Sequence, residues 1–170
     1  DVLGWNAALT ATATDGALSI APVSYLDVPV TPFARIDTAV TVAFWQFGDP
    51  LNQPRASSIF EANDAKGARV LNAHLPWSDG VVFGDAGAGG YDRIQKAATA
   101  DNYKGRWNHW AFTKNSSTGE MKVYLNGVLW HSGTAKTKAM RGIATFRIGS
   151  NGAASGNWYA GMVDDFAVWN

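Results

Sequence analysis

The chain has 170 residues, of which 46% are hydrophobic and 16% are charged, and its 14 basic side chains balance its 14 acidic ones. This composition excludes a disordered chain, and no apolar run reaches the roughly 20 residues that a membrane-spanning helix needs. The net charge of zero gives no overall field that would attract nucleic acid or an anionic membrane. We therefore expect a single soluble domain over residues 1–170, with neither nucleic acid nor a membrane as its partner.

The two ends of the chain have no feature of a natural terminus. The first six residues lack the basic and apolar regions of a signal peptide. The chain ends at Trp169 and Asn170, directly after an apolar run and without a polar tail. We expect a domain excised from a longer, multidomain protein. The absence of cysteine excludes disulfide bonds and thiolate metal sites.

Short segments with the periodicity of strands fill the chain from residue 40 onward. In the first, residues 40–47, the apolar Val40, Val42 and Phe44 alternate with residues that face the other way, the period of a strand with one buried face. The other segments with this pattern are Ser58 to Ala62, Arg69 to Leu75, Gly80 to Gly84, Tyr91 to Gln95, Trp107 to Lys114, Met121 to Leu125, Thr145 to Gly149 and Tyr159 to Trp169.

Turn residues separate these segments. Asn126 and Gly127 lie between two strand-like runs and predict a hairpin, because both residue types tolerate positive φ. Residues 116–119 predict another hairpin just before it. Only the alanine-rich stretch Gln95 to Asn102 tolerates a helix, and a loop with a single turn fits it as well. Many short strands with regular turns predict an all-β fold, a two-sheet antiparallel sandwich in preference to a barrel.

The segment from Asn72 to Gly80 combines an aromatic side chain with several polar ones. On a strand, Asn72 and His74 share one face, while the apolar residues beside them share the other and should point into the core. We expect Asn72 and His74 on an open face, followed by a loop that presents Trp77 and Asp79. Sugars have apolar ring faces and many hydroxyl groups, so such a set can bind them. For Trp77, a structural role fits equally well.

Three more side chains with rings alternate with the apolar positions of their segments and should therefore point to the opposite side of the strand. They are Trp45 in the first segment, and Trp107 and His109 in the segment that starts at residue 107. We expect them to line the same face as Asn72 and His74. A position in the core or at its rim is the alternative.

Two loops offer further contacts. The glycine-rich loop of residues 85–93 ends in Tyr91 and Arg93, and loops carry binding residues more often than strands do. The guanidinium of Arg93 suits a glycan with carboxylate or sulfate groups, which it can bind through two hydrogen bonds. The loop of residues 151–158 adds Trp158 as an aromatic candidate.

Seven sequence segments occur in a recognisable order. They are Gly16 to Ile20, Tyr25 to Pro29, Val40 to Trp45, Trp107 to Thr113, Val123 to Val128, Phe146 to Gly149 and Ala160 to Trp169. In this order they resemble the laminin-G-like, or concanavalin-A-like, lectin domains known from extracellular bacterial proteins. The resemblance implies a jelly-roll sandwich with one concave and one convex sheet, adjacent first and last strands, and a location that is secreted or at the cell surface.

The same resemblance implies a structural calcium ion that ties the first strand to the last. Residues 15–20 and 163–168 match the two segments that bind it in the related sandwich glycosidases. The ligands carried over are the carbonyl of Gly16 and the carboxylate and carbonyl of Asp164, oxygen ligands of the kind that calcium takes. A further backbone ligand would come from the first few residues. Alternatively, Asp164 belongs to a solvated bulge or edge.

Catalysis is less well supported than binding. The related glycosidases carry Glu-x-Asp-x-x-Glu on one strand, and the two glutamates of this chain, Glu61 and Glu120, lie outside any such pattern. A polysaccharide lyase would need a base beside a cation, which the histidines with Tyr91 and Arg93 could supply. Nothing in the sequence marks a histidine as activated.

The sequence therefore favours a non-catalytic module that binds a polysaccharide or oligosaccharide. Such a module would be attached to a secreted glycoside hydrolase, a lyase or a surface protein. A structural or adhesion module of a large extracellular protein, without a sugar site, is the first alternative, and a polysaccharide lyase is the second.

Overall fold

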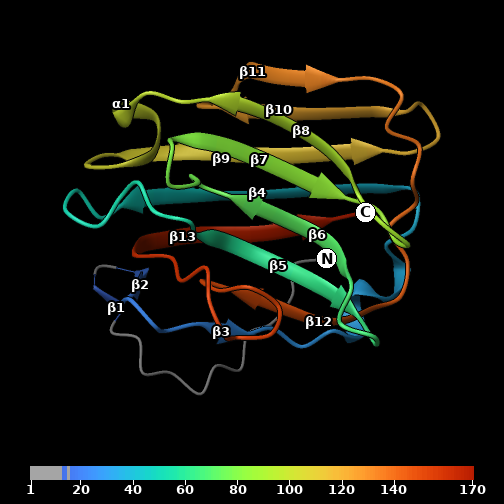
Figure 1. The fold of residues 1–170 in the computed structure, drawn as a ribbon, viewed down its shortest axis with the longest axis horizontal. Coiled ribbons are helices and arrows are strands. Elements are labelled where there is room, and N and C mark those ends of the chain that lie inside the picture. The colour runs from blue at the N-terminus through green and yellow to red at the C-terminus, as the bar shows by residue number, and fades with distance from the viewer. Residues whose placement is uncertain (1–12, 15) are drawn as a thin grey trace.

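The computed structural model describes residues 13–14 and 16–170, which form two stacked antiparallel sheets (Figure 1). The seven-stranded sheet has the order β1 (Ala13–Thr14), β2 (Ala17–Ile20), β13 (Gly161–Trp169), β4 (Ala39–Gly48), β9 (Trp107–Asn115), β10 (Glu120–Leu125) and β11 (Val128–Gly133). The six-stranded sheet has the order β3 (Leu26–Asp27), β12 (Ile143–Ile148), β5 (Ser58–Asp64), β6 (Arg69–His74), β7 (Val81–Ala86) and β8 (Asp92–Ala97). The predicted all-β, two-sheet antiparallel sandwich is confirmed.

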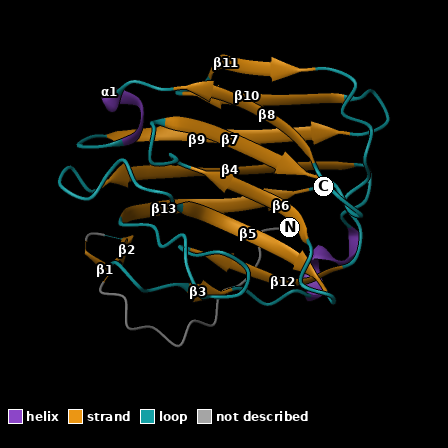
Figure 2. Ribbon diagram, viewed as in Figure 1, coloured by secondary structure: helices purple, strands orange, loops and turns teal. Residues whose placement is uncertain are grey.

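Helical structure in the described residues is confined to two short turns (Figure 2). A 3-10 helix spans Thr31–Arg35, and α1 spans Ala100–Tyr103. The stretch predicted to tolerate a helix is divided between β8, which continues to Ala97, and α1. Thr99 starts α1 because its backbone N–H donates to the side-chain oxygen of Asn102 at 3.0 Å, a local bond that favours a helix start.

Two local predictions of the chain path are confirmed. Asn126 and Gly127 have φ of +51° and +79° and join β10 to β11, as the hairpin signal requires. The opening strand β2 pairs with the last strand, β13, with Leu18 opposite Val163. Both ends of the described chain therefore lie in one sheet, where β13 separates β2 from the central strand β4.

A cluster of phenylalanine rings joins the two sheets. Phe60 comes from the six-stranded sheet, and its ring centroid lies 6.2 Å from that of Phe44 and 6.1 Å from that of Phe112, both on the seven-stranded sheet. On its own sheet, Phe60 stacks on Phe146 at 5.8 Å. The alternation predicted for β4 holds, since Val40, Val42 and Phe44 are all buried. Alternate residues of β4 therefore point away from the core.

Truncation of Phe60 tests the role of this cluster. We expect Phe60→Ala to lower the free energy of unfolding by about 3–5 kcal/mol, because it removes the ring that contacts both sheets and leaves a cavity. Urea denaturation followed by tryptophan fluorescence measures the loss. Leu51→Ala is the control, since Leu51 is 94% exposed and its truncation should change the free energy by less than about 0.5 kcal/mol. Equal effects of the two substitutions would contradict this account of the core.

Candidate functional site

The structure divides the predicted binding residues between the two outer faces of the sandwich. Asn72, His74 and Arg93 belong to the six-stranded sheet. Trp45 belongs to β4 of the seven-stranded sheet, together with Trp107 and His109 of β9. The expectation that Trp45, Trp107 and His109 line the same face as Asn72 and His74 is wrong. Alternation within each strand gives the face of a side chain, but only the pairing of strands decides which sheet it belongs to.

On the outside of the six-stranded sheet, one polar residue from each strand forms a continuous row. In the order of the strands the row consists of Asp27, Arg147, Glu61, Asn72, Asp85 and Arg93, each opposite the next. We call the outer surface around this row the polar face. Such cross-strand neighbours lie close enough for direct contact.

The charged groups of the polar face are paired with one another. Asp85, whose side chain is fully buried, accepts two hydrogen bonds from Arg93, at 2.6 and 2.8 Å. Arg69 bridges Asp85 and Glu61 at 2.7 and 2.9 Å. The hydrogen bond with Asp85 raises the pKa of Arg93. Because a buried carboxylate already occupies its fork, Arg93 has less capacity for an anionic ligand than its sequence position suggested.

Asn72 and His74 are 1% and 2% exposed, so the expectation that they lie open to a ligand is wrong. The amide of Asn72 donates to Glu61 at 3.0 Å and to the Phe60 carbonyl at 3.1 Å. The imidazole of His74 lies 4.5 Å from the ring of Trp77, in an edge-on contact. Their strand does alternate as predicted, but the loop after β6 and the neighbouring side chains cover its outer side.

Burial lowers the pKa of His74 to about 4, the largest cause being the loss of water around the ring. Its Nδ1 lies 3.0 Å from the carbonyl oxygen of Ser57, a distance that fits an N–H donating to that carbonyl in the neutral ring. A neutral imidazole held in this way acts as a structural element of the polar face.

The remaining candidates on this side lie apart from one another. Tyr91 is 40% exposed and lies against the guanidinium groups of Arg69 and Arg93, at 5.3 and 5.2 Å. Asp79 closes a turn by accepting a hydrogen bond from the N–H of Val81 at 3.0 Å. Trp158 is half-buried, with its ring 6.1 Å from that of Tyr25.

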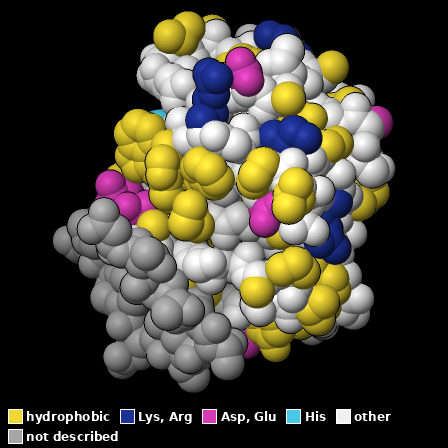
Figure 3. Space-filling model, turned by 90° about the vertical axis from the view of Figure 1, so that its left-hand side faces the viewer, with side chains coloured by type: hydrophobic (Ala, Val, Ile, Leu, Met, Phe, Trp, Pro, Cys, Tyr) yellow, Lys and Arg dark blue, Asp and Glu magenta, His cyan; other side chains and the backbone are white. Residues whose placement is uncertain are grey.

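The outside of the seven-stranded sheet is built differently. Its outward-pointing residues are Thr41, Ala43, Trp45 and Phe47 of β4, Trp107, His109, Ala111, Thr113 and Asn115 of β9, Glu120, Lys122 and Tyr124 of β10, and Met162, Asp164, Ala167 and Trp169 of β13. We call this set the aromatic face. Figure 3 shows part of its edge, where hydrophobic side chains gather at the end of the sandwich next to acidic ones.

Two cross-strand ring pairs mark one end of the aromatic face. Trp45 lies opposite His109 with ring centroids 5.2 Å apart, and Phe47 lies opposite Trp107 at 5.8 Å. Trp45 and Trp107 are each 40% exposed. The pairs fix the orientation of two large rings while leaving part of each in contact with solvent. The structure therefore brings together three of the predicted residues, Trp45, Trp107 and His109.

A hollow of about 360 Å³ lies toward the other end of the aromatic face and was not predicted. Between the hollow and the rings, Ala43 lies opposite Ala111 and Ala167, which are all small residues. The residues lining the hollow include Thr41, Thr113, Asn115, Glu120, Lys122 and Tyr124. Thr41 lies four residues before Trp45 on the same strand, so the alternation in the sequence already placed it on the same face. The residues that β10 contributes to the hollow could not be predicted, because they depend on strand pairing.

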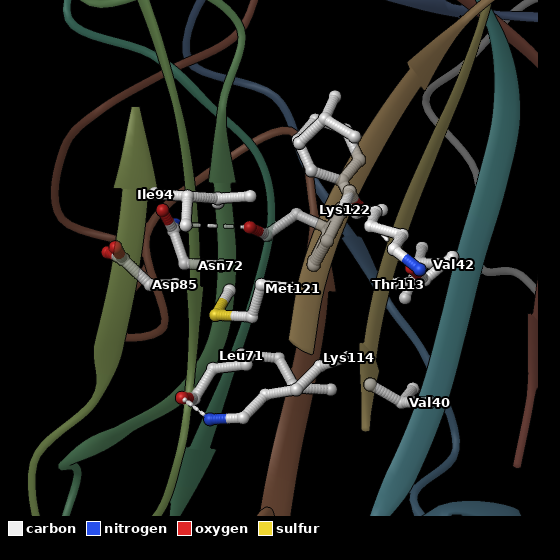
Figure 4. A pocket seen from close by; sticks show the side chains of 15 residues that line it. Val40, Val42, Leu71, Asn72, Asp85, Ile94, Thr113, Lys114, Met121 and Lys122 are labelled. Atoms are coloured by element: carbon white, nitrogen blue, oxygen red, sulfur yellow. Dashed lines mark hydrogen bonds between the residues drawn. The ribbon is translucent and has the colours of Figure 1, made fainter. Parts of the chain in front are cut away.

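A smaller cavity inside the sandwich holds no ligand-sized space (Figure 4). Its volume is about 20 Å³, which suits one water molecule. Lys114 borders it and reaches across the core from β9 to β7 and β8, where its ammonium donates to the carbonyl of Ala86 at 2.6 Å and to the carboxylate of Asp92 at 2.8 Å. Burial lowers the pKa of Lys114. This lysine joins the two sheets.

Gly16 and Asp164, the residues that the resemblance implied for calcium, lie at the same end of one strand pair. The β2–β13 ladder ends at Leu18 opposite Val163, and continuing its register places residues 16 and 17 beside Asp165 and Asp164. Asp165 has a φ of +47° in the bulge that interrupts β13. The described residues include no cluster of three or more His, Asp or Glu side chains able to hold a metal. Besides the Asp164 carboxylate, an ion here would depend on backbone oxygens, and the further backbone ligand expected from the first few residues lies outside the described residues.

His74 makes the stability of the fold depend on pH. Since its pKa is lowered from 6.5 to about 4, the unfolded chain binds a proton at this residue before the folded chain does. The stabilisation is complete above about pH 6.5 and is lost as the pH falls toward 4, by up to roughly 3 kcal/mol at about 1.4 kcal/mol per pKa unit. We expect urea denaturation at pH 7 and pH 4.5 to show a smaller loss for His74→Gln than for the wild type. Equal losses would show that another group carries the dependence.

The comparison with protein families gives one match, which spans most of the chain. The model described as the concanavalin A-like lectin/glucanases superfamily, in its laminin-G form, matches residues 22–170. A comparison with curated protein sequences gives no match. In the described part of the chain, no helix is long and apolar enough to cross a membrane.

Several solved structures share the fold at low sequence identity. Domain 4 of AbnA, a GH43 extracellular arabinanase from Geobacillus stearothermophilus in complex with arabinotriose, has a TM-score of 0.71 at 19% identity, over 98% of this chain and 76% of that one. Mouse laminin alpha1 domains LG4-5 have a TM-score of 0.66 at 11% identity, and the match covers 89% of this chain and 40% of the laminin chain. The botulinum neurotoxin serotype D ligand binding domain, solved with N-acetylneuraminic acid, has a TM-score of 0.69 at 12% identity. The match covers 96% of this chain and 42% of the neurotoxin chain.

The chain spans less than half of the laminin and neurotoxin chains that it matches. These likenesses concern the fold alone, whereas the family match rests on the sequence of residues 22–170. The chain is a laminin-G-like member of the concanavalin A-like lectin/glucanases superfamily.

Proposed function

We propose that the chain is a non-catalytic carbohydrate-binding module that holds an oligosaccharide or polysaccharide on the aromatic face. The observation that carries this proposal is the pair of part-exposed rings, Trp45 and Trp107, on the same face as a hollow of about 360 Å³. Exposed tryptophan rings can stack on the apolar faces of sugar rings. The volume lies within the range of about 300–1,000 Å³ typical of ligand sites.

The polar face is a weaker candidate for this role. Its carboxylates and guanidinium groups already bond to one another, as in the pairs of Asp85 with Arg93 and Glu61 with Arg69. A ligand would have to replace these short, charge-assisted bonds with its own. On the aromatic face, by contrast, the hydroxyl groups of Thr41 and Tyr124 have no hydrogen-bond partner among the described residues.

The placement of the acidic and histidine side chains supports a binding role over catalysis. Glu61 belongs to the polar face and Glu120 to the aromatic face, so the two cannot meet at the roughly 5 Å that a retaining glycosidase needs. His74 is buried, and His109 lies on the opposite sheet from Tyr91 and Arg93. Tyr91 and Arg93 do lie together, with Arg93 donating to the Tyr91 hydroxyl at 3.4 Å, but Arg93 is already bound to Asp85 at 2.6 Å, which favours a binding role over a lyase.

The similar structures support the sugar as ligand class and an extracellular setting. The arabinanase domain was solved with arabinotriose and comes from an extracellular enzyme, and the neurotoxin domain was solved with N-acetylneuraminic acid. We place this chain outside the cell as one module of a larger protein. A structural or adhesion module without a sugar site is the alternative that the binding experiment decides.

Titration calorimetry with arabino-oligosaccharides, neutral plant polysaccharides and a sialylated oligosaccharide tests the proposal. We expect saturable binding to one of these, with about tenfold weaker affinity for Trp45→Ala and for Trp107→Ala, because each change removes a stacking ring. Tyr91→Ala is the matched control, since Tyr91 is also 40% exposed but lies on the polar face. Binding lost in Tyr91→Ala and kept in both tryptophan variants would assign the site to the other face.

A structural calcium ion is a second part of the proposal. The carbonyl of Gly16 and the carboxylate of Asp164 lie at neighbouring strand positions and are hard oxygen donors, which fit calcium. The ion would neutralise the adjacent Asp164 and Asp165 and hold β2 to β13. The N–H of Asp165 donates to one carboxylate oxygen of Asp164 at 2.8 Å, which orients that side chain.

Removal of calcium tests this site. We expect a chelator to lower the melting temperature of the wild type, because an ion that binds only the folded state stabilises it in proportion to the logarithm of its concentration. Asp164→Asn should melt at the same temperature with and without chelator. Asp79→Asn, a change of the same kind in a turn of the six-stranded sheet, should keep the wild-type response. A wild-type melting temperature that ignores both calcium and chelator would remove the ion from the proposal.

A further inference from the structure

The aromatic face carries little charge that could attract an anion. On β4, β9, β10 and β13 its outward-pointing ionisable side chains are His109, Glu120, Lys122 and Asp164, with Asp165 in the neighbouring bulge. The single cation among these, Lys122, lies 3.2 Å from Glu120. With His109 neutral the set sums to about −2, and a bound calcium ion would bring it to about zero. No arginine belongs to the set.

Three arginines that pair with carboxylates at short distances lie on the other sheet. Arg69, Arg93 and Arg147 all belong to the six-stranded sheet, and each already pairs with a carboxylate within 2.6–2.9 Å. Arginine forks are the groups that proteins use most for planar or tetrahedral anions. In this domain they stabilise the polar face.

The hollow instead offers uncharged groups that both donate and accept hydrogen bonds. Thr41, Thr113 and Tyr124 contribute hydroxyl groups, and Asn115 contributes an amide whose oxygen accepts from the N–H groups of residues 117 and 118. Hydroxyls and amides match the hydroxyl groups of a sugar in both directions. This chemistry requires no charge on the ligand.

The face is also long. From His109 to Asn115 along β9 there are six residue steps, or about 20 Å at roughly 3.3 Å per residue. Rings lie at one end of this path, alanines in the middle, and the hydroxyl groups with the Glu120–Lys122 pair at the other end. Such a path suits a chain of several linked sugar units better than a single terminal sugar.

We propose that the aromatic face binds an extended, uncharged glycan chain along β4 and β9 and discriminates against sulfated or uronic-acid polymers. This inference rests on the proposed function and adds to it the class of glycan and its direction. A sulfate placed over β4, β9 and β10 would meet Glu120 and the Asp164 region, and the nearby cations are paired, Lys122 with Glu120 at 3.2 Å and Arg106, next to Trp107, with Asp101 at 3.3 Å. Specificity would then come from unfavourable contacts with the wrong polymer as well as favourable contacts with the right one.

Matched polymers give the direct test. Linear arabinan, xylan and dextran would each be compared with their chemically sulfated derivatives by calorimetry, at low and at physiological ionic strength. We expect at least one neutral polymer to bind with an affinity that ignores salt, and its sulfated form to bind at least tenfold more weakly at low salt. Equal or tighter binding of a sulfated form, weakening as salt rises, would overturn the inference while leaving sugar binding intact. Binding to none of the six polymers would overturn this inference, whereas the proposed function would still be judged by its own oligosaccharide panel.

A charge reversal provides the second test. Glu120→Lys removes the partner of Lys122 and changes the local charge from zero to about +2. We expect this variant to bind the sulfated polymer severalfold more tightly than the wild type does, in a salt-dependent manner. Asp79→Lys makes the same change in net charge on a turn of the six-stranded sheet and should leave binding of sulfated polymers unchanged. Equal gains in both variants would show that net charge, and not this face, decides the outcome. The polymer comparison on the wild type stands independently of how either variant folds.

Discussion

The contact between the two sheets through a cluster of phenylalanine rings is the constraint on which the rest of the structure depends. Phe60 and Phe146 from one sheet pack against Phe44, Phe112 and Phe166 from the other. Because side chains of a strand alternate in direction, fixing Phe44 and Phe112 inward fixes their neighbours outward. Trp45 and His109 are therefore outside because the residues beside them are inside. The core therefore determines which side chains form the aromatic face.

The outward-pointing side chains of the two faces differ in how far they satisfy one another. On the polar face, buried carboxylates and arginines satisfy one another, which leaves a closed surface in which even Asn72 and His74 have almost no contact with solvent. Buried charges are tolerable only when they are paired in this manner. On the aromatic face the rings remain part-exposed, and a hollow lies toward the other end of the same strands. One sheet is thus closed by its own side chains and the other is open to a partner.

The openness of the aromatic face has a structural basis in residue size. Alanines at positions 43, 111 and 167 lie side by side across β4, β9 and β13, while tryptophans occupy positions 45 and 169 on either side along the strands. The alanines contribute little side-chain volume between the tryptophans, and Trp169 is also exposed. Neither the row of alanines nor the exposed tryptophans would stabilise a monomer, because exposed rings lose the burial that stabilises a core. They are understandable as parts of a ligand surface.

The class of fold, the direction of most strand side chains and the Asn126–Gly127 hairpin could be predicted from the sequence, since these follow from the local alternation of apolar residues and from the φ values that turn residues tolerate. The sequence also identified Trp45, Trp107 and His109 as side chains outside the core. Only the tertiary structure decided which strands are neighbours, and hence that these three residues lie on the opposite side of the sandwich from Asn72, His74 and Arg93. It likewise decided that Arg93 is paired and His74 is covered. The physical reason is that strand pairing and the closure of ion pairs join residues far apart in the chain, and the alternation within one strand contains no information about either.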